Sequence, residues 1–419
     1  MKLFHCADIH LGRRRLDGRL PDSDFADAFA WLAGEAIGGK ADAFLLAGDL
    51  FDKPQVEPHH LRQAQTTLQR LRDAAIPVIA IEGNHDKASL HSTGPTWLDF
   101  LADDGLLHLL KPRFDAAGAI LDGAIFNLGG VRFIGAGYLG AATPHKVRQI
   151  LERLETGREQ VMLLHAGPDY FVGEGGGFSA EDLRGIRERV RYLALGHIHK
   201  PMLHGGWACN PGSPENCDLR EAAYDSEPRG FAWVELFPGE DARVTIGRNP
   251  RRPVVKLELD GTPFGNKLKD GPGALVNAAV KLIQGAVIPA GAVVQIRLVG
   301  SINLNRVALD LEALAVAIEL ATGVVAVAFD AAGVNAEGMA AGAGGDDAGL
   351  SREALERQAI SDLVADEPLW GLDAERLAIA DLIFDLKEAV REQRSAEEIA
   401  VTIDAHPLLE TIRAARATP

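Results

Sequence analysis

Five short motifs rich in Asp, Asn and His interrupt the first half of the chain and constrain its fold more than any other feature. Each follows an apolar run of strand length, a pattern typical of buried strands that end in loops. In an open α/β sheet the carboxyl ends of the strands converge on one rim, where ligands bind. We therefore expect the five loops to meet there. The motifs are Asp8–His10, Gly48–Asp52, Gly83–Asp86, Leu164–Gly167 and Gly196–His199.

Apolar spacing predicts an α/β domain over residues 1–248. Helix-period segments at Phe25–Ala36 and His60–Ala75 lie between the first strand-like runs. Strands that alternate with helices predict a layered sheet with helices on its faces. The expected strands are Lys2–Cys6, Ala43–Ala47, Val78–Ile81, Arg132–Ala136, Val161–Leu164 and Tyr192–Leu195.

A second, smaller α/β pattern follows a proline-containing linker at Asn249–Pro253, and it predicts a small domain over residues 249–332. The strands expected there are Val254–Leu259, Val293–Val299 and Val324–Phe329, with helices at Ala274–Gln284 and Ala308–Ala321.

The last part of the chain reads as a tether and a helical tail. Residues 333–350 are rich in Gly and Ala, which predicts a flexible linker. Residues 351–419 are predicted to be helical and to form a partner-binding tail. Over Ala374–Arg394 one apolar stripe recurs at helical spacing, which favours either docking on a partner or packing on the chain itself. The stripe consists of Ile379, Leu382, Ile383, Leu386 and Val390.

Length, charge and cysteine content set limits on function. A chain of 419 residues favours two or three domains. The net charge of −16 argues against a broad basic face for nucleic acid, although bound metal ions can dominate the charge of a local site. The chain shows neither a membrane-length apolar run nor a secretory signal. Its three cysteines lack metal-finger spacing, which suits a reducing cytoplasm, and we assign them no role.

The side chains of the five motifs suit a pair of divalent metal ions. They offer seven oxygen and nitrogen ligands without a thiolate, a set that fits Mn, Fe or Zn. A carboxylate such as Asp49 can bridge two ions, which is the geometry used for phosphoryl displacement. Two ions and two carboxylates leave a net charge of about +2, which attracts an anionic phosphodiester. The expected metal ligands are Asp8, His10, Asp49, Asn84, His165, His197 and His199.

His85 directly follows the expected ligand Asn84 and is assigned a different role. We expect it to face the substrate, where it donates a proton to the leaving oxygen or stabilises charge at phosphorus. Either Asp52 or Asp86 could orient it, and the sequence does not choose between them. The remaining histidines, His59 and His60 among them, lack such a context and are expected to be structural.

The order of these motifs resembles the calcineurin-like metallophosphoesterase superfamily. Five stretches also resemble the bacterial SbcD exonuclease family and the Mre nucleases of double-strand-break repair. That resemblance implies a metallophosphoesterase β-sandwich flanked by helices, here with a small α/β capping domain that faces DNA and a helical C-terminal tail. The five stretches are Ala7–Gly12, Leu45–Asp52, Ile81–Asp86, Leu195–Lys200 and Asn210–Glu215.

The resemblance further implies how the ligands divide and which partners the chain has. One ion would be held by Asp8, His10, Asp49 and His199, and the other by Asp49, Asn84, His165 and His197, with His85 catalytic. Manganese is the usual activating ion of the family. Its nucleases work with an SMC-like ATPase of the SbcC type, which is gripped by C-terminal helices.

Two groups of arginines are candidates for contact with the DNA backbone. Arg13, Arg14 and Arg15 follow the first motif, and Arg251 and Arg252 precede the second α/β pattern. A solvated charged loop is the alternative interpretation of such runs.

The sequence thus predicts a dinuclear-metal-dependent DNA nuclease, an exonuclease of DNA repair, that hydrolyses phosphodiesters with a metal-activated hydroxide. One alternative keeps the site but acts on nucleotides or another small phosphoester. A second alternative is a non-catalytic scaffold subunit. A homodimer is possible, and we expect no membrane association.

Overall fold

The computed structural model describes residues 1–87, 94–155, 159–172, 177–264, 273–301, 310–335 and 376–391, together with Ile403 and His406. The chain divides into two compact units. One comprises Met1–Ile302 with Arg306–Asn335, and the other comprises Asn303–Asn305 with Ala336–Pro419. Most of the linker and tail predicted at 333–350 and 351–419 lies outside the described residues.

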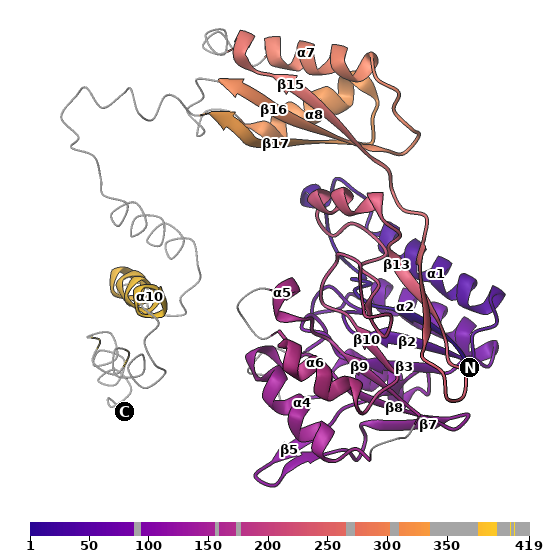
Figure 1. Ribbon diagram of the computed structural model, residues 1–419. Helices are drawn as coiled ribbons and strands as arrows, with labels where there is room; N and C mark the ends of the chain where they lie inside the picture. Colours follow the sequence, from indigo (N-terminus) through magenta and orange to yellow (C-terminus); the bar gives the residue numbers. More distant parts are fainter. Residues whose placement is uncertain are drawn as a thin grey trace. The chain divides into compact units, whose positions relative to one another are not determined.

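Two six-stranded sheets form the centre of residues 1–248 (Figure 1). The first has the order β14-β13-β1-β2-β3-β4 and the second the order β11-β12-β10-β9-β8-β7. The strands of the first are β1 (Lys2–Cys6), β2 (Ala43–Ala47), β3 (Val78–Ile81), β4 (His108–Leu109), β13 (Gly230–Glu235) and β14 (Arg243–Arg248). Those of the second are β7 (Ile125–Leu128), β8 (Val131–Ala136), β9 (Gln160–Leu164), β10 (Tyr192–Leu195), β11 (Met202–His204) and β12 (Ala208–Asn210).

The strands that precede the five motifs run parallel to one another within each sheet, and only the outer neighbour of β1, strand β13, is antiparallel to it. In the first sheet β1 pairs with β2 and β2 with β3, and in the second β8 pairs with β9 and β9 with β10. The strands therefore end at the same edge within each sheet. A buried apolar cluster joins the two sheets face to face, with Leu45 and Ile79 from one sheet and Phe133 and Leu163 from the other.

Helices cover the outer face of each sheet. This part of the chain therefore has four layers, with two sheets between two layers of helices. The first sheet packs against α1 (Ser23–Gly38), α2 (Pro58–Asp73) and α3 (Trp97–Asp103), and the second against α4 (Thr143–Glu152) and α6 (Ala180–Arg187). The short elements are η1 (Leu16–Gly18), β5 (Arg113–Asp115), β6 (Gly118–Ile120), η2 (Gly140–Ala142), α5 (Asp169–Val172) and η3 (Leu219–Ser226). The predicted layered sandwich is confirmed.

Helix ends explain the small differences from the predicted boundaries. The second helix begins at Pro58 rather than His60, because proline is favoured in the first turn, where its missing N–H costs nothing. Capping boxes start α3 at Thr96 and α6 at Ser179, where the side chains of Asp99 and Asp182 bond back to the cap residues.

The segment 254–335 is a separate three-stranded parallel sheet in the order β15-β16-β17. It contains β15 (Val254–Asp260), η4 (Thr262–Phe264), α7 (Gly273–Gln284), β16 (Val293–Ser301), α8 (Leu311–Thr322) and β17 (Ala326–Asn335). Helix α8 begins at Leu311 rather than at the predicted Ala308, because Asp310 caps it by accepting the N–H of Ala313 at 2.9 Å. The strands and helices expected here form, but this segment belongs to the same compact unit as residues 1–248. Its standing as a separate domain that faces DNA stays a prediction.

The apolar tail helix forms within the second unit as α10 (Arg376–Arg391). Its most buried described side chains are Ala380 and Phe384, whereas Ile383 of the predicted stripe is 43% exposed.

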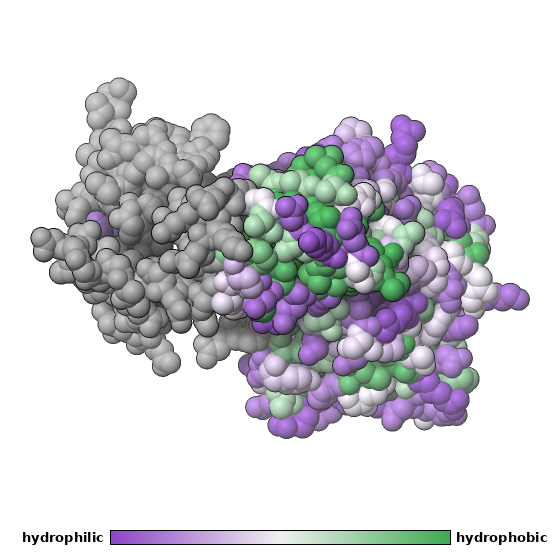
Figure 2. Space-filling view, turned by 90° about the horizontal axis from the view of Figure 1, so that it is seen from above, coloured by the Kyte–Doolittle hydropathy of each residue, from purple (hydrophilic) through white to green (hydrophobic). Residues whose placement is uncertain are grey.

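No helix in the described ranges is long and apolar enough to cross a membrane. Exposed apolar side chains such as Val287 and Leu320 also occur in the segment 254–335, and Figure 2 shows hydrophobic patches among hydrophilic ones on the face turned to the viewer.

Candidate metal centre

The five motifs meet at the edge where their strands end. Asp8 and His10 follow β1, Asp49 follows β2, Asn84 and His85 follow β3, His165 follows β9, and His197 and His199 follow β10. One ligand atom each of Asp8, Asp49 and His165 lies within 4.8 Å of the other two. A second group of the same tightness contains His10, Asp52 and His85, and a third contains His10, His199 and Cys217.

On one side of this centre, two histidines point at the same amide oxygen. Oδ1 of Asn84 lies 3.1 Å from Nε2 of His165 and 3.0 Å from Nδ1 of His197. Nε2 of His165 also lies 3.2 Å from Oδ2 of Asp49. These four side chains are the ones that the resemblance assigns to one metal ion, and their ligand atoms converge.

On the other side, two imidazoles face each other. Nε2 of His10 lies 3.1 Å from Nε2 of His199 and 3.7 Å from Oδ2 of Asp49. The carboxylate of Asp8 is fully buried and accepts the backbone N–H of His197 at 3.0 Å. The Asp49 carboxylate therefore lies beside both histidine groups, as expected of a bridging ligand.

Hydrogen bonds on the outer nitrogens fix the orientation of two of these rings. Nδ1 of His165 donates to the backbone oxygen of Ala47 at 2.7 Å, and Nδ1 of His199 donates to Oε1 of Glu221 at 2.7 Å. Because each Nδ1 carries the hydrogen in the neutral ring, each Nε2 presents a lone pair toward the centre. Histidines that ligate metals are commonly held in this way by a carbonyl or a carboxylate. The residues present therefore fit a dinuclear metal centre.

The electrostatics of the centre favour additional positive charge. Burial opposes protonation of His165, but the charge and hydrogen bond of Asp49 raise its pKa to about 9. Burial likewise opposes protonation of His199, but hydrogen bonds with Cys217 and Glu221 raise its pKa to about 11. Burial alone would raise the pKa of Asp49, yet the neighbouring histidines hold it well below its usual range. A bound cation could take the place of these protons.

The backbone of the centre is strained at four expected ligands. Asp8, His10, Asp49 and His197 have φ values of 56°, 52°, 53° and 86°, in the left-handed region that non-glycine residues rarely adopt. Such strain persists only where the surrounding structure imposes it, and it clusters at functional sites.

Glycines next to the ligands are required by close packing. A Cβ atom on Gly83 would lie 1.9 Å from Oδ1 of Asp49, and one on Gly48 would lie 2.2 Å from Nδ1 of His165. No side chain larger than hydrogen fits at either position without moving a ligand.

His85 is held in place by a backbone carbonyl rather than by either predicted carboxylate. Its Nδ1 donates to the backbone oxygen of Asp52 at 2.7 Å, and its backbone N–H donates to Oδ1 of Asp49 at 2.9 Å. Nε2 is then the ring nitrogen available to a substrate. The carboxylate of Asp86 instead accepts backbone N–H groups from Leu50, Phe51 and Gly83 and so ties two metal-binding loops together.

Two residues of the centre are not identified by the sequence motifs. Glu221 orients His199 from η3, 22 positions later in the sequence, and no local pattern marks it. Cys217, to which the sequence assigns no role, lies beside His10 and His199, and its backbone N–H donates to Oε2 of Glu221 at 3.0 Å. Burial raises the pKa of the Cys217 thiol to about 11. All three cysteines are free and buried.

The five candidate DNA-contacting arginines fall into two groups. Arg13 and Arg14 are 36% and 69% exposed, and they pair with Asp52 at 3.2 Å and Glu57 at 3.3 Å. Arg15, Arg251 and Arg252 are mostly buried in internal ion pairs, as with Oδ1 of Asp225, 2.6 Å from Nη1 of Arg251. The DNA contact predicted for these last three is therefore not supported, because their guanidinium groups hold the linker and the loop after the first motif.

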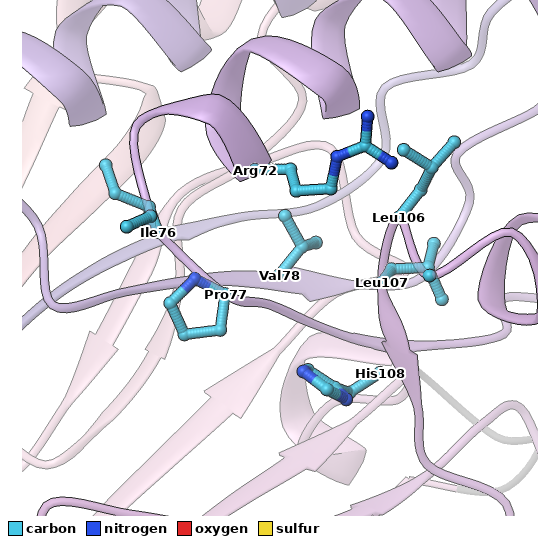
Figure 3. A pocket seen from close by; sticks show the side chains of 9 residues that line it. Arg72, Ile76, Pro77, Val78, Leu106, Leu107 and His108 are labelled. Carbon is cyan, nitrogen blue, oxygen red and sulfur yellow. The ribbon is translucent and has the colours of Figure 1, made fainter.

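A separate pocket lies between the end of α2 and strands β3 and β4 (Figure 3). Its lining includes Arg72, Ile76, Val78, Leu107 and His108. None of the expected ligands lines it, so it is not a candidate for the same chemistry.

Comparison with known proteins supports the interpretation of this site. Residues 1–201 match the family model described as calcineurin-like phosphoesterase. The DNA double-strand break repair protein Mre11 of Archaeoglobus fulgidus is 31% identical over 57% of this chain and 58% of its own length. The protein of the same name from Aeropyrum pernix is 27% identical, over 62% of this chain and 63% of its own length.

The chain spans less than two thirds of the length of each of these relatives, and the same holds for Mre11 of Haloferax volcanii, which is 30% identical over 62% of this chain and 54% of its own length. Residues 1–201, which match the family model, contain all five motifs. Residues 1–201 are therefore similar to the calcineurin-like phosphoesterases, and the chain is similar to the Mre11 DNA double-strand break repair proteins.

Proposed function

We propose that this chain is a metal-dependent DNA nuclease that acts in DNA repair. The observation that carries the proposal is the convergence of seven oxygen and nitrogen ligands from five strand ends beside His85. Support for DNA as the substrate comes from relatives named as DNA double-strand break repair proteins.

Two divalent ions would be held by the two halves of the centre. Asp8, His10, Asp49 and His199 would hold one, and Asp49, Asn84, His165 and His197 would hold the other. When bound, such a pair supplies Lewis-acid stabilisation of a phosphoryl group and a water-derived nucleophile at neutral pH. Manganese is the proposed ion, with iron and zinc as alternatives of similar ligand preference.

The protein's own contribution to the chemistry centres on His85. The Asp52 carbonyl holds Nδ1, which keeps Nε2 directed away from that bond and available to an incoming phosphodiester. From there it can give a proton to the departing oxygen or stabilise charge at phosphorus. Arg13 and Arg14 follow the first motif, Arg13 half-buried beside Asp52 and Arg14 exposed, and we assign them to the neighbouring phosphates of the backbone.

Two further features belong to the same proposal. The segment 254–335 would face DNA, and helix α10 would grip an SMC-like ATPase of the SbcC type. A charged helix with one apolar stripe suits a docking role.

The test is degradation of end-labelled double- and single-stranded DNA in Mn²⁺, with wild type compared with His85→Ala. We expect turnover to fall by about 10²- to 10⁴-fold in the variant, because general acid catalysis contributes on that scale. The metal content should not change, since His85 is not an expected ligand. His145→Ala, an exposed histidine on α4, is the matched control.

Other outcomes would redirect the proposal. Activity on bis-p-nitrophenyl phosphate, with none on DNA even with an ATPase partner, would indicate a small phosphodiester substrate. Absence of any hydrolysis, in a protein whose stability does not depend on metal, would indicate a scaffold subunit. Loss of metal in His85→Ala would make that residue a ligand.

A further inference from the structure

A second cluster of metal-ligating side chains lies outside the centre described above. It consists of Asp22, which precedes α1, and of His59 and His60, in the first turn of α2. One ligand atom of each residue lies within 4.8 Å of the other two.

The three side chains converge on one point. Oδ2 of Asp22 lies 2.9 Å from Nε2 of His60 and 3.5 Å from Nε2 of His59. Asp22 occupies the N-cap position of α1, where aspartate ordinarily accepts a backbone N–H, yet it makes no such bond. Its carboxylate is turned to the histidines instead.

A simple hydrogen bond accounts for only part of this arrangement. The contact with Asp22 explains the buried His60, but His59 is 51% exposed and could hydrogen-bond to water instead. It nevertheless lies against His60, with ring centroids 3.7 Å apart, and its Nε2 faces the same carboxylate oxygen as that of His60. Its other nitrogen, Nδ1, lies 3.6 Å from Oε2 of Glu57. A carboxylate behind a histidine is the arrangement that orients metal-ligating imidazoles.

We propose that Asp22, His59 and His60 bind a third divalent ion, of the zinc class. Two imidazoles and one carboxylate, with water in a fourth position, form a familiar set for Zn²⁺. Mg²⁺ and Ca²⁺ prefer oxygen ligands, so they do not suit this site. The N-terminus of α2 disfavours a cation, and the charges of Asp22 and Glu57 offset that effect.

An ion at this site would connect the two segments that follow the first two catalytic motifs. Asp22 ends the segment that begins after His10, and His59 and His60 start the helix that follows the Asp49 motif. Gly12 packs directly on His60, since a Cβ there would lie 2.8 Å from its Nδ1.

The adjoining pocket, of about 240 Å³, is lined by Gly12, Arg14, Asp52, Glu57 and His60 among others. The backbone carbonyl of Asp52 also holds His85. The third ion would therefore hold the segment that carries Arg13 and Arg14 close to Asp52, the residue whose backbone carbonyl orients His85. Its binding does not rest on the proposed nuclease activity.

The test counts ions on the full chain. The protein is stripped with a chelator and dialysed to equilibrium against rising Zn²⁺, and the bound zinc per chain is measured by mass spectrometry. At low Zn²⁺, wild type should bind one ion more than Asp22→Asn or His59→Ala. The affinity for that ion should be at least about tenfold lower in each variant, because removal of a mere outer partner of a metal ligand already costs about that much. His145→Ala is the matched control and should bind as many ions as wild type.

Thermal unfolding provides a second readout that does not involve DNA cleavage. Zn²⁺ should raise the Tm of wild type more than that of His59→Ala, because an ion bound only to the folded state stabilises it. Equal ion counts in wild type, Asp22→Asn and His59→Ala would overturn the proposal. An equal loss in His145→Ala would overturn it as well, since it would indicate unspecific binding to surface histidines.

Discussion

Two regions of the molecule are built from the same parts, parallel strands with helices packed on them. One is the edge of residues 1–248 that carries the expected metal ligands, called the metal edge below, and the other is the segment 254–335. They differ at the strand ends. At the metal edge, Asp8, Asp49 and His165 follow their strands with 0%, 2% and 1% of their surface exposed. In the segment 254–335, Asp260 ends β15 with an exposed side chain that accepts hydrogen bonds from Thr262, from its backbone N–H at 2.9 Å and from its side chain. Parallel topology alone therefore does not create a site.

The backbone shows the same contrast. Of the seven described non-glycine residues with positive φ, four are expected metal ligands, and none lies in the segment 254–335. Polar groups buried in unfavourable conformations are a cost that a purely structural region avoids. The difference places the backbone strain among the expected metal ligands and not in the smaller sheet. The four ligands are Asp8, His10, Asp49 and His197.

The largest expected effect is a loss of stability in the segment 254–335 that leaves the metal edge unchanged. Leu314 is buried on α8, so Leu314→Ala should lower the free energy of unfolding of the segment 254–335 by about 2–5 kcal/mol. Urea unfolding followed by hydrogen exchange would measure the change, and bound manganese should stay the same. Leu320→Ala, the same substitution at an 83% exposed site on the same helix, should change stability by less than about 0.5 kcal/mol. Loss of metal in Leu314→Ala would contradict the prediction and show that the two regions are coupled, for instance through the ion pair of Arg19 with Glu319 on α8.

Two glycine substitutions test whether the metal edge tolerates an added methyl group less well than the segment 254–335. In Gly83→Ala the new Cβ would displace Asp49, and a shift of about 1 Å in a catalytic group can cost about 10²-fold in kcat/KM. Gly273, at the start of α7, has no atom within 4 Å of the place that an added methyl group would occupy, so Gly273→Ala should leave cleavage unchanged. Steady-state cleavage assays on both variants would check this. Full activity in Gly83→Ala would show that the centre is less tightly packed than the structure indicates.

A smaller effect is expected for the residue that orients His199. Glu221→Gln keeps the shape of the side chain but removes the charge behind the imidazole, and loss of such a partner commonly weakens metal binding by about 10- to 100-fold. Manganese titration followed by cleavage would show a higher metal requirement with turnover restored at saturation. The exposed Glu227→Gln serves as the control. Unchanged metal affinity in Glu221→Gln would mean that the ligand set holds His199 without it.

The fold and the ligand set could be predicted because the information is local. Each motif follows its strand directly, so apolar spacing and the adjacent polar residues identify both the strand and the ligand. Glu221 could not be found in this way, because it reaches His199 only through the tertiary fold. The partner of His85 could not be chosen either, since a backbone carbonyl holds it and every residue has one.

The three consecutive arginines show the same limit. In the sequence Arg13, Arg14 and Arg15 are equivalent, and only the fold brings Glu215, 200 residues away, to 3.2 Å from Arg15. Burial of a charge depends on such distant partners, so a run of like residues cannot be divided into structural and functional members before the fold is known.

The smallest expected effect, that of Arg14→Ala, tests whether Arg14 contacts DNA while Arg15 is structural. Arg14→Ala should change the free energy of unfolding by less than about 0.5 kcal/mol, because the pair of Arg14 with Glu57 is exposed. It should reduce the slope of DNA affinity against salt concentration by about the amount of one phosphate contact. Binding measured over a range of salt concentrations would show this, with the exposed Arg184→Ala on α6 as the control. Arg15→Ala should instead lower the stability, because it leaves the carboxylate of Glu215 without its buried partner. An unchanged salt slope in Arg14→Ala would remove the loop after the first motif from the DNA path and leave the segment 254–335 as the remaining candidate.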